Sequence, residues 1–390
     1  MLIEHKQIAI VGGGPAGLAL ARLLQLKEVP NAFGIKVYER DINRDVRVQG
    51  ATLDLHEGTG LEALKRAGLL DEFYKNHRPV ASKMRLTDGL LNIVFDDHDF
   101  ATITADTRPE IDRAPLRDML LNSLKPNTVV WNSHFVSMEK EKNGWRLHFK
   151  NGTNAYADLV IAADGANSKV RPYLSNIKPI YSGVTLIEGN IYDAEKHTPK
   201  LFAFAKGGKV MAFDNEQFMG YGTKGDGSIM FVANFKTHEN WLAQSGIDFN
   251  NRQQVLEWFK QEFAGWSDEW HEFFTNEAVY FIPRPQYYFP FDQSWETQEN
   301  LTMIGDAAHR MPPYAGEGAN VALQDAFELA ECLTNNQFTD IKTAIAHFEK
   351  EMIARGAQAT KDTLENTERM FSKNGLEQMS AFFNQVKDEG

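Results

Sequence analysis

Six residues near the N-terminus, Gly12-Gly13-Gly14-Pro15-Ala16-Gly17, constrain the fold more than any other feature of the chain. They spell G-x-G-x-x-G between a β-branched apolar run, 7–11, and an apolar-periodic segment, 15–27. There the first glycine permits a tight turn, the second lets backbone approach a pyrophosphate, and the third lets helix and strand pack closely. With a second strand at 35–38, the sequence predicts a βαβ unit that binds a dinucleotide rather than an ordinary glycine turn.

Glu39 narrows the choice of dinucleotide. It lies 22 residues beyond Gly17, at the end of the second strand, where an acid can bind ribose hydroxyls. Its carboxylate repels the 2′-phosphate of NADP and suits FAD or NAD. A second G-x-G-x-x-G, at 220–225, precedes Asp226-Gly227 and an alternating strand, so we expect a hairpin loop there. A nicotinamide cofactor therefore has no Rossmann domain of its own.

A second glycine-rich segment lies near the other end of the chain. Asp306 follows the strand-like run 301–304, and 316–320 opens a helix whose backbone N–H groups can stabilise an anion. The Asp306 carboxylate suits a sugar-like chain of hydroxyls. The two glycine-rich segments together fit FAD held in an extended form.

Asp164-Gly165 follows the apolar run 159–163, and taken alone this pair favours a plain turn and N-cap. His309 has no metal-spaced partner, so we expect a structural histidine and no metal site.

Composition excludes several classes of protein. The 390 residues are 43% hydrophobic, enough for a buried core, and the formal charge of −12 disfavours nucleic-acid or anionic-membrane partners. One cysteine, Cys332, rules out an intramolecular disulfide, and its apolar-periodic surroundings predict a packed helix residue. We see no signal peptide and no membrane-spanning apolar run, so the sequence favours a cytoplasmic protein.

The pattern of elements predicts an α/β fold. We expect a Rossmann-like FAD-binding domain made of 1–172 and 292–340, interrupted by a β-rich substrate domain. That domain, 173–291, has alternating apolar segments typical of an antiparallel sheet, with one helix near 252–263. Residues 341–390 are expected to form C-terminal helices.

Three motifs in this order and spacing carry a resemblance: Gly12 to Gly17 with Glu39-Arg40, then Asp164-Gly165, then Gly305-Asp306. Over nearly the whole chain the sequence resembles the FAD-dependent aromatic hydroxylases of the para-hydroxybenzoate hydroxylase type. The stretches 37–41, 50–56 and 305–313 are most similar to the tetracycline-inactivating flavin monooxygenases.

The resemblance implies a role for each matching position. Glu39, with Arg40 beside it, would bind the adenosine ribose, and Asp306 the ribityl hydroxyls. Arg113 would approach the phosphates or ribityl chain. The remaining implied positions are Asp54 near FAD, Arg47 by the isoalloxazine and incoming NADPH, Asp164-Gly165 serving both cofactors indirectly, and Gly316 to Asn320 along the flavin N1–C2 edge. The expected cofactor-binding set is Gly12, Gly14, Pro15, Ala16, Gly17, Glu39, Arg40, Arg47, Asp54, Arg113, Asp164, Gly165, Asp306, Pro313, Gly316, Gly318, Ala319 and Asn320.

The substrate pocket departs from the resemblance. Where the tetracycline-modifying enzymes place Gln, Arg and His, an ungapped comparison puts Glu188, Lys209 and Met230. These are changes in charge and hydrogen-bonding capacity. We expect a polycyclic phenol or enol as substrate, which is either tetracycline or another fused-ring or phenolic molecule. We expect the aromatic-rich middle segment to form a dry wall around it.

The implied activity is that of an NADPH- or NADH-consuming monooxygenase that delivers oxygen from O2 through a flavin C4a-hydroperoxide. It needs no side-chain nucleophile, and we expect a monomer. The alternatives are another flavoenzyme, a dehydrogenase or halogenase, although no W-x-W-x-I-P stretch is present, and a non-catalytic protein that sequesters flavin or a drug.

Overall fold

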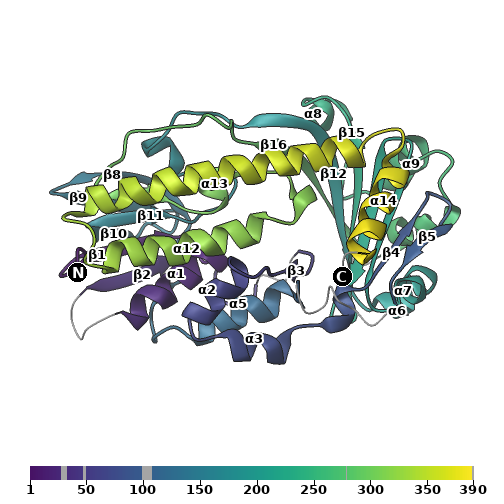
Figure 1. Ribbon diagram of the computed structural model, residues 1–390. Helices are drawn as coiled ribbons and strands as arrows, with labels where there is room; N and C mark the ends of the chain where they lie inside the picture. The colour runs from purple at the N-terminus through teal and green to yellow at the C-terminus, as the bar shows by residue number, and fades with distance from the viewer. Residues whose placement is uncertain (28–32, 47–49, 99–107, 278, 389–390) are drawn as a thin grey trace.

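A parallel five-stranded sheet forms the centre of the part that carries the N-terminus. The structure is a computed structural model that describes residues 1–27, 33–46, 50–98, 108–277 and 279–388 (Figure 1). The order of strands is β17-β11-β1-β2-β7, and every neighbouring pair is parallel. The strands are β1 (Gln7–Val11), β2 (Gly34–Tyr38), β7 (Val129–Val130), β11 (Leu159–Ala162) and β17 (Leu301–Met303).

Helices cover this sheet because βαβ connections return across its face. α1 packs against α12 and α5, and α12 packs in turn against α2 and α13. The helices are α1 (Pro15–Leu26), α2 (Gly60–Arg66), α3 (Leu70–Asn76), α5 (Arg113–Asn122), α11 (Asp306–His309), α12 (Gly318–Thr334) and α13 (Ile341–Met370). A three-stranded antiparallel sheet adjoins them, in the order β10 (Asn154–Ala157), β9 (Gly144–Phe149) and β8 (Phe135–Glu141). Its two turns contain the pairs Asn143-Gly144 and Asn151-Gly152.

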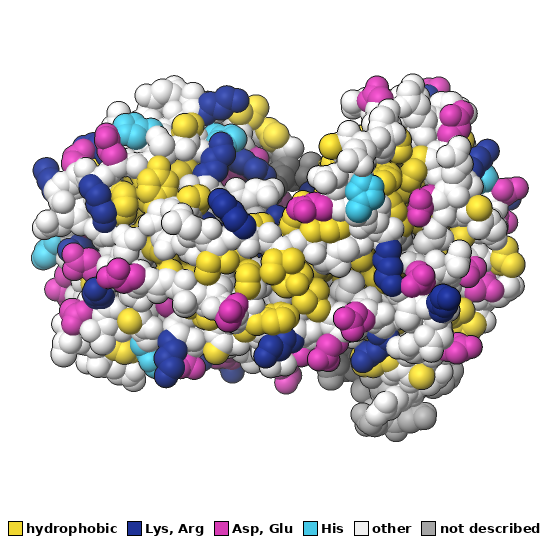
Figure 2. All heavy atoms as spheres, turned by 90° about the horizontal axis from the view of Figure 1, so that it is seen from above, with side chains coloured by type: hydrophobic (Ala, Val, Ile, Leu, Met, Phe, Trp, Pro, Cys, Tyr) yellow, Lys and Arg dark blue, Asp and Glu magenta, His cyan; other side chains and the backbone are white. Residues whose placement is uncertain are grey.

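A seven-stranded sheet forms the second part, and an indentation separates the two parts in Figure 2. The order is β16 (Tyr280–Tyr288), β12 (Ile180–Ile191), β15 (Ile229–Lys236), β14 (Gln217–Thr223), β13 (Lys209–Asp214), β4 (Met84–Thr87) and β5 (Ile93–Asp96). The last two strands come from the segment expected in the FAD-binding domain, and β13 pairs with β4 in parallel. The sheet is therefore mixed and extends beyond 173–291. The division into 1–172 with 292–340, 173–291 and 341–390 stays a prediction.

One face of this sheet holds an aromatic core. Phe231 of β15 stacks on Phe273 at 4.5 Å between ring centroids, within a cluster that includes Trp270. The helical elements on this side are α6 (Ala194–His197), α7 (Pro199–Ala205), α8 (Trp241–Gln244), α9 (Arg252–Glu262), η3 (Asp268–His271) and α10 (Glu272–Thr275). These aromatic residues fill a core on one face, while Phe213 and Phe218 stack at 4.8 Å on the opposite face, so the expected aromatic wall around a substrate stays a prediction.

Two C-terminal helices join the parts. In Figure 1, α13 runs from the end of the molecule that carries the N-terminus to the seven-stranded sheet. α14 (Gly375–Asp388) then packs on β13, β4 and β5. The other short elements are the two-stranded sheet β3 (Leu53–Asp54) and β6 (Glu110–Ile111), and the 3-10 turns η1 (Pro79–Ser82), η2 (Arg171–Tyr173) and η4 (Pro313–Ala315). Among the described residues, none of the helices has the length and apolarity needed to span a membrane.

One local expectation needs correction. The segment 220–225 is not a hairpin loop throughout, because β14 continues to Thr223 and the turn to β15 begins at Lys224. Gly220 serves strand packing there, since a Cβ atom would lie 2.6 Å from the Phe218 ring. Helix α5 begins at Arg113, which places Pro115 in its first turn, where its missing N–H costs nothing.

Candidate active site

The three glycines after β1 have different surroundings. A Cβ atom on Gly12 (φ +113°) would lie 2.2 Å from the Ala163 carbonyl oxygen, and one on Gly17 would lie 2.2 Å from the Gly12 carbonyl oxygen. No atom lies within 4 Å of the Cβ position of Gly14. The first and third glycines therefore allow close packing, and the second faces open space.

The N-terminus of α1 adjoins that space. Helix α1 begins at Pro15 and Ala16 with no side-chain cap and no acidic residue in its first turn. The unsatisfied N–H groups and the helix dipole are then available to an anion. This combination fits a pyrophosphate held over Gly14.

Glu39 lies directly beneath the glycine loop. Its side chain is buried, and its two oxygens accept hydrogen bonds from the Gly13 N–H at 2.6 Å and the Asp41 N–H at 3.0 Å. The carboxylate therefore fixes the loop and the end of β2 relative to each other. Arg40 is exposed beside it. Arg47, expected near the flavin ring, lies outside the described residues.

Asp164 follows β11 and has one oxygen that lacks a protein partner. Its Oδ2 accepts from the Lys169 N–H at 2.8 Å, as the expected turn requires, whereas its buried Oδ1 has no hydrogen-bond partner. Burial raises the pKa of Asp164. Gly165 has φ +80° and open space at its Cβ position. An orphaned acceptor beside open space is what a site for a polar ligand provides.

Asp306 begins α11 and is exposed, although the surrounding protein withdraws it from bulk water enough to raise its pKa. The charges of His309, Arg113 and Arg310 act in the opposite direction. Arg113 therefore lies close enough to Asp306 for their charges to interact. Arg113 itself, the first residue of α5, donates to the Ala51 carbonyl at 3.1 Å.

The segment before α12 carries the expected flavin-edge residues. Pro313 starts the turn η4, Gly316 has φ +71°, and Gly318 and Ala319 are the first residues of α12. Asn320 is fully buried, and its side chain accepts from the His56 N–H at 2.9 Å and donates to the Asp54 carbonyl at 3.0 Å. The Asn320 side chain is therefore engaged within the protein, whereas backbone N–H groups at the start of α12 can face a ligand.

Two further candidate residues, which the sequence did not single out, lie next to Asp54. His56 Nε2 lies 3.0 Å from Asp54 Oδ2, and His56 Nδ1 lies 3.6 Å from Glu317 Oε1. Burial lowers the pKa of His56, but the hydrogen bonds to both carboxylates outweigh it and raise that pKa to about 9. Burial raises the pKa of Asp54, but His56, Lys209 and Arg108 bring it below its ordinary value. His56 is thus an imidazolium held between two carboxylates.

Glu110 is the second missed residue, and it lies opposite Asp54 in the β3–β6 pair. Its buried carboxylate contacts the Lys209 ammonium group, while its Oε2 has no hydrogen-bond partner. Burial raises the pKa of Glu110, and Lys209 opposes that shift. No local sequence pattern signals this pair, because its members are 99 residues apart.

The three expected substrate residues project from one face of the seven-stranded sheet. Across neighbouring strands, Met230 of β15 pairs with Gly222 of β14, and Gly222 pairs with Lys209 of β13. On the other side, Met230 pairs with Asn190 of β12, and Glu188 lies two residues before Asn190. Partners across a ladder and residues two apart share a face. Glu188 is buried and accepts from Arg284 Nε at 2.5 Å.

Two contacts show that this face of the sheet lies against the FAD-binding part. One is Lys209 with Glu110. The other is the hydroxyl of Tyr314, in η4, which donates to Asn234 Oδ1 at 3.1 Å. The row with Met230 and Lys209 therefore faces the region between β3 and the start of α12.

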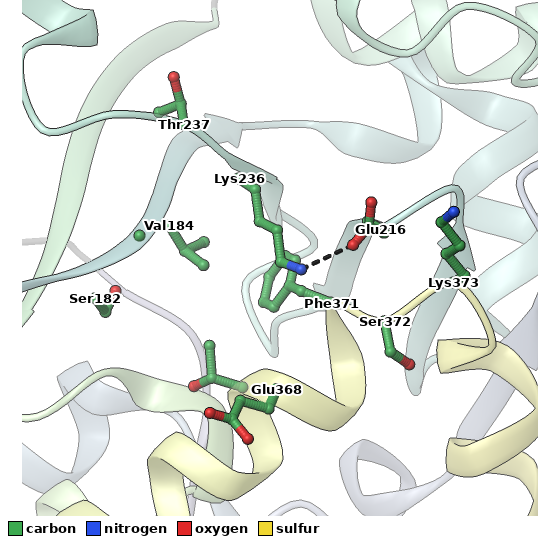
Figure 3. A pocket seen from close by; sticks show the side chains of 11 residues that line it. Ser182, Val184, Glu216, Lys236, Thr237, Glu368, Phe371, Ser372 and Lys373 are labelled. Carbon is green, nitrogen blue, oxygen red and sulfur yellow. Dashed lines mark hydrogen bonds and ion pairs between the residues drawn. The ribbon is translucent and has the colours of Figure 1, made fainter.

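A separate hollow of about 600 Å³ opens at the other end of this sheet face, where Val184 pairs with Lys236 (Figure 3). Figure 3 shows Lys236 and Glu216 on one side, with their charged groups 2.8 Å apart, and on the other side Glu368 of α13 and Ser372, which lies between α13 and α14. Phe371 at its edge packs on Tyr314, with ring centroids 5.2 Å apart. This hollow contains none of the expected site residues.

Comparison with known proteins matches a family described as FAD binding domain to residues 5–361. The chain belongs to the FAD binding domain family. The expected FAD-dependent monooxygenase family is thereby confirmed, and the open space over Gly14, the uncapped α1 and the orphaned Asp164 oxygen fit the cofactor that names it.

Curated relatives of this FAD binding domain chain are named monooxygenases. Monooxygenase penA of Penicillium thymicola is 27% identical over 96% of this chain and 97% of its own length. The 6-hydroxynicotinate 3-monooxygenase of Pseudomonas fluorescens is 24% identical over 93% and 92%.

Solved structures confirm the fold class of this family member. Tetracycline destructase Tet(55) superposes with a TM-score of 0.77 at 20% identity, over 100% of this chain and 96% of that one. HpxO of Klebsiella pneumoniae, solved with FAD and uric acid, gives a TM-score of 0.74 at 18% identity, over 98% and 93%. At such identities the likeness shows the fold alone.

Proposed function

We propose that the protein hydroxylates a planar, phenolic or enolic polycyclic small molecule, with FAD as cofactor, O2 as oxidant and NADPH or NADH as electron donor. The observation that carries the proposal is the row Met230, Gly222 and Lys209 on the sheet face turned toward β3 and α12. Gly222 carries no side chain, so the sheet surface is flat there, and a Cβ atom would make only ordinary contacts with the Lys209 stem at 3.6 Å and the Gly208 carbonyl oxygen at 3.9 Å. A flat ring can lie on such a surface.

The cofactor side is supplied by the FAD-binding part. Gly14 and the first turn of α1 would hold the pyrophosphate, Glu39 the adenosine ribose and Asp306 the ribityl hydroxyls. The backbone of Gly318 and Ala319, at the positive end of α12, would stabilise negative charge on the ring edge. Bound FAD, once reduced by the nicotinamide, supplies the activation of O2.

The sheet side orients the substrate. The Lys209 ammonium group stabilises the anionic form of a substrate hydroxyl, which makes the adjacent ring carbon electron-rich. The unpartnered Glu110 Oε2, whose pKa is raised by burial, can hold the proton that the hydroxyl loses. Glu188, held by Arg284, offers an acceptor on the other side of Met230. Two charged pairs on one surface favour a ligand with several oxygens, and tetracycline is one candidate.

The test uses the FAD-loaded protein with ¹⁸O2 and either NADPH or NADH, and with tetracycline and salicylate as probes. One ¹⁸O atom in the product supports the proposal, and substrate-dependent NAD(P)H oxidation without label in any product contradicts it. Lys209→Met is expected to lower kcat/KM about tenfold or more, because a charged hydrogen bond to the substrate anion is lost. Lys236→Met, on the same sheet but at the separate hollow, serves as the control.

The alternatives give different outcomes. A dehydrogenase turns over anaerobically with an artificial acceptor, a halogenase requires halide, and a sequestering protein binds ligand without turnover. Monomeric assembly and a cytoplasmic location are also proposals, and sedimentation of the purified protein tests the first.

A further inference from the structure

Asp325 of α12 is a fully buried carboxylate that receives hydrogen bonds from three donors, two at α11 and one on α13. Its Oδ2 accepts from the Gly305 N–H at 2.8 Å and lies 2.6 Å from His309 Nε2. Its Oδ1 accepts from Arg355 Nη2 of α13 at 2.9 Å. The side chains of Asp325 and His309 are 0% and 1% exposed. This carboxylate therefore ties α11, α12 and α13 together.

Asp325 fixes the backbone of Gly305, the residue before Asp306. Gly305 has φ +61°, a conformation that favours glycine, and it precedes the first residue of α11. Its N–H is bound by Asp325, and its carbonyl accepts from the N–H groups of Ala308 and His309 at 2.8 and 3.0 Å. Both polar groups of Gly305 are thus fixed, so the direction in which Asp306 leaves the turn is fixed as well.

Helix α13 closes the back of the same turn. A Cβ atom on Gly356 would lie 2.7 Å from the Cβ of His309, so α13 approaches α11 as closely as a glycine allows. Arg355, one residue earlier, binds Asp325 and also lies 2.8 Å from Glu328. The long C-terminal helix is therefore part of the support of the Asp306 turn, although its sequence predicts only a separate helical unit.

The buried Asp325–His309 pair is an inefficient way to stabilise the fold. Burying a carboxylate and an imidazolium costs several kcal/mol before their attraction is counted, and well-packed apolar residues often do as well. His309 Nδ1 is in addition buried without a hydrogen-bond partner. What the carboxylate achieves that an apolar residue cannot is a fixed backbone geometry at Gly305.

We propose that Asp325 is a positioning residue for FAD, which acts through Gly305 and His309 to aim the Asp306 carboxylate at the ribityl chain. The inference rests on the proposed role of Asp306. If Asp325 positions Asp306, a change of Asp325 should lower the affinity for FAD by more than any loss of protein stability explains. The Asp306 side chain is still present in such a variant, but its direction is no longer fixed.

The experiment compares Asp325→Asn with Glu349→Gln. Glu349 is an equally buried carboxylate, on α13, whose oxygens accept from Thr297 and Thr302 at 2.6 and 2.8 Å. Apoprotein is titrated with FAD by the quenching of flavin fluorescence, and its thermal unfolding is measured in parallel. We expect Asp325→Asn to raise the Kd for FAD about tenfold or more, the size expected for a charged hydrogen bond, and Glu349→Gln less than about twofold.

A second variant and a double mutant keep the test decisive. If Asp325→Asn does not fold, Arg355→Met removes one of the three donors and is expected to raise the Kd about threefold. In an Asp306→Ala background, Asp325→Asn should weaken FAD binding by less than about twofold, since the two changes act through one contact.

Two results are distinguishable as failures. An unchanged Kd in Asp306→Ala overturns the proposed ribityl site itself. A raised Kd for FAD in Asp306→Ala together with an unchanged Kd in Asp325→Asn overturns only the positioning role. A rise in Kd in Glu349→Gln as large as that in Asp325→Asn also overturns only the positioning role.

Discussion

The Lys209 ammonium group of β13 contacts the carboxylate of Glu110 on β6, and so joins the seven-stranded sheet to the FAD-binding part. Glu110 has a 3% exposed side chain, whereas that of Lys209 is 34% exposed. The lysine can therefore meet a ligand on its open side while it neutralises a carboxylate on its buried side.

Lys209→Met is expected to lower the free energy of unfolding by about 1–3 kcal/mol at pH 8, because Glu110 is left buried and unpaired. Burial already holds the pKa of Glu110 above its ordinary value, and removal of Lys209 raises it further. A folded-state pKa above the unfolded one means that stability returns as pH falls. Urea unfolding at pH 8 and pH 5 should show a smaller deficit at pH 5. An equal deficit at both values contradicts this account, and Glu110→Gln/Lys209→Met should recover part of the loss.

Gly12→Ala and Gly14→Ala are expected to differ in kind. The first meets the Ala163 carbonyl and a φ of +113°, so it should cost about 3 kcal/mol or more of stability. The second meets no protein atom within 4 Å. It should change apoprotein stability by less than about 0.5 kcal/mol yet weaken FAD binding about tenfold or more, because its methyl group takes the space assigned to the pyrophosphate. Thermal unfolding and FAD titration measure both. Normal FAD affinity in Gly14→Ala would place the pyrophosphate elsewhere.

The protonated His56 should make the apoprotein more stable below pH 7 than at pH 9. Its pKa of about 9 exceeds the ordinary 6.5, so this contribution is full below about 6.5 and is lost as pH rises through about 9. We expect it to be about 1–2 kcal/mol after screening by solvent. His56→Gln should flatten the unfolding free energy across this window. His148→Gln, at a histidine with a 41% exposed side chain, is the control. A wild-type slope retained in His56→Gln would count against the assignment.

Cys332 should resist alkylation in the folded protein. It is buried on α12, and burial raises its pKa to about 11, so little thiolate forms at pH 8. Iodoacetamide should react about tenfold or more slowly than with the urea-unfolded chain, as followed by mass spectrometry. Comparable rates would show that this part of α12 opens readily.

The sequence by itself determined what short-range physics fixes. The strand, glycine turn and helix at 7–26 follow from apolar periodicity and from the backbone freedom of Gly12, and the helix from Arg252 follows from its apolar spacing. The ends of β2 and β11 placed Glu39 and Asp164 next to the glycine loop, since parallel strands end at one edge. The cofactor side of the site was therefore accessible from local pattern.

Only the tertiary structure decided how the two parts meet. Alternation along β15 puts Phe231 and Val232 on opposite faces, but it does not say which face turns toward FAD. The contact of Asn320 with His56 spans 264 residues, and that of Lys209 with Glu110 spans 99. Such contacts depend on how the chain crosses between sheets, and residues so far apart leave no periodic trace in the sequence. For this reason the cofactor motifs and the candidate position Lys209 were readable from the sequence, whereas the contacts of Lys209 with Glu110 and of Asp325 with Gly305 had to be seen in three dimensions.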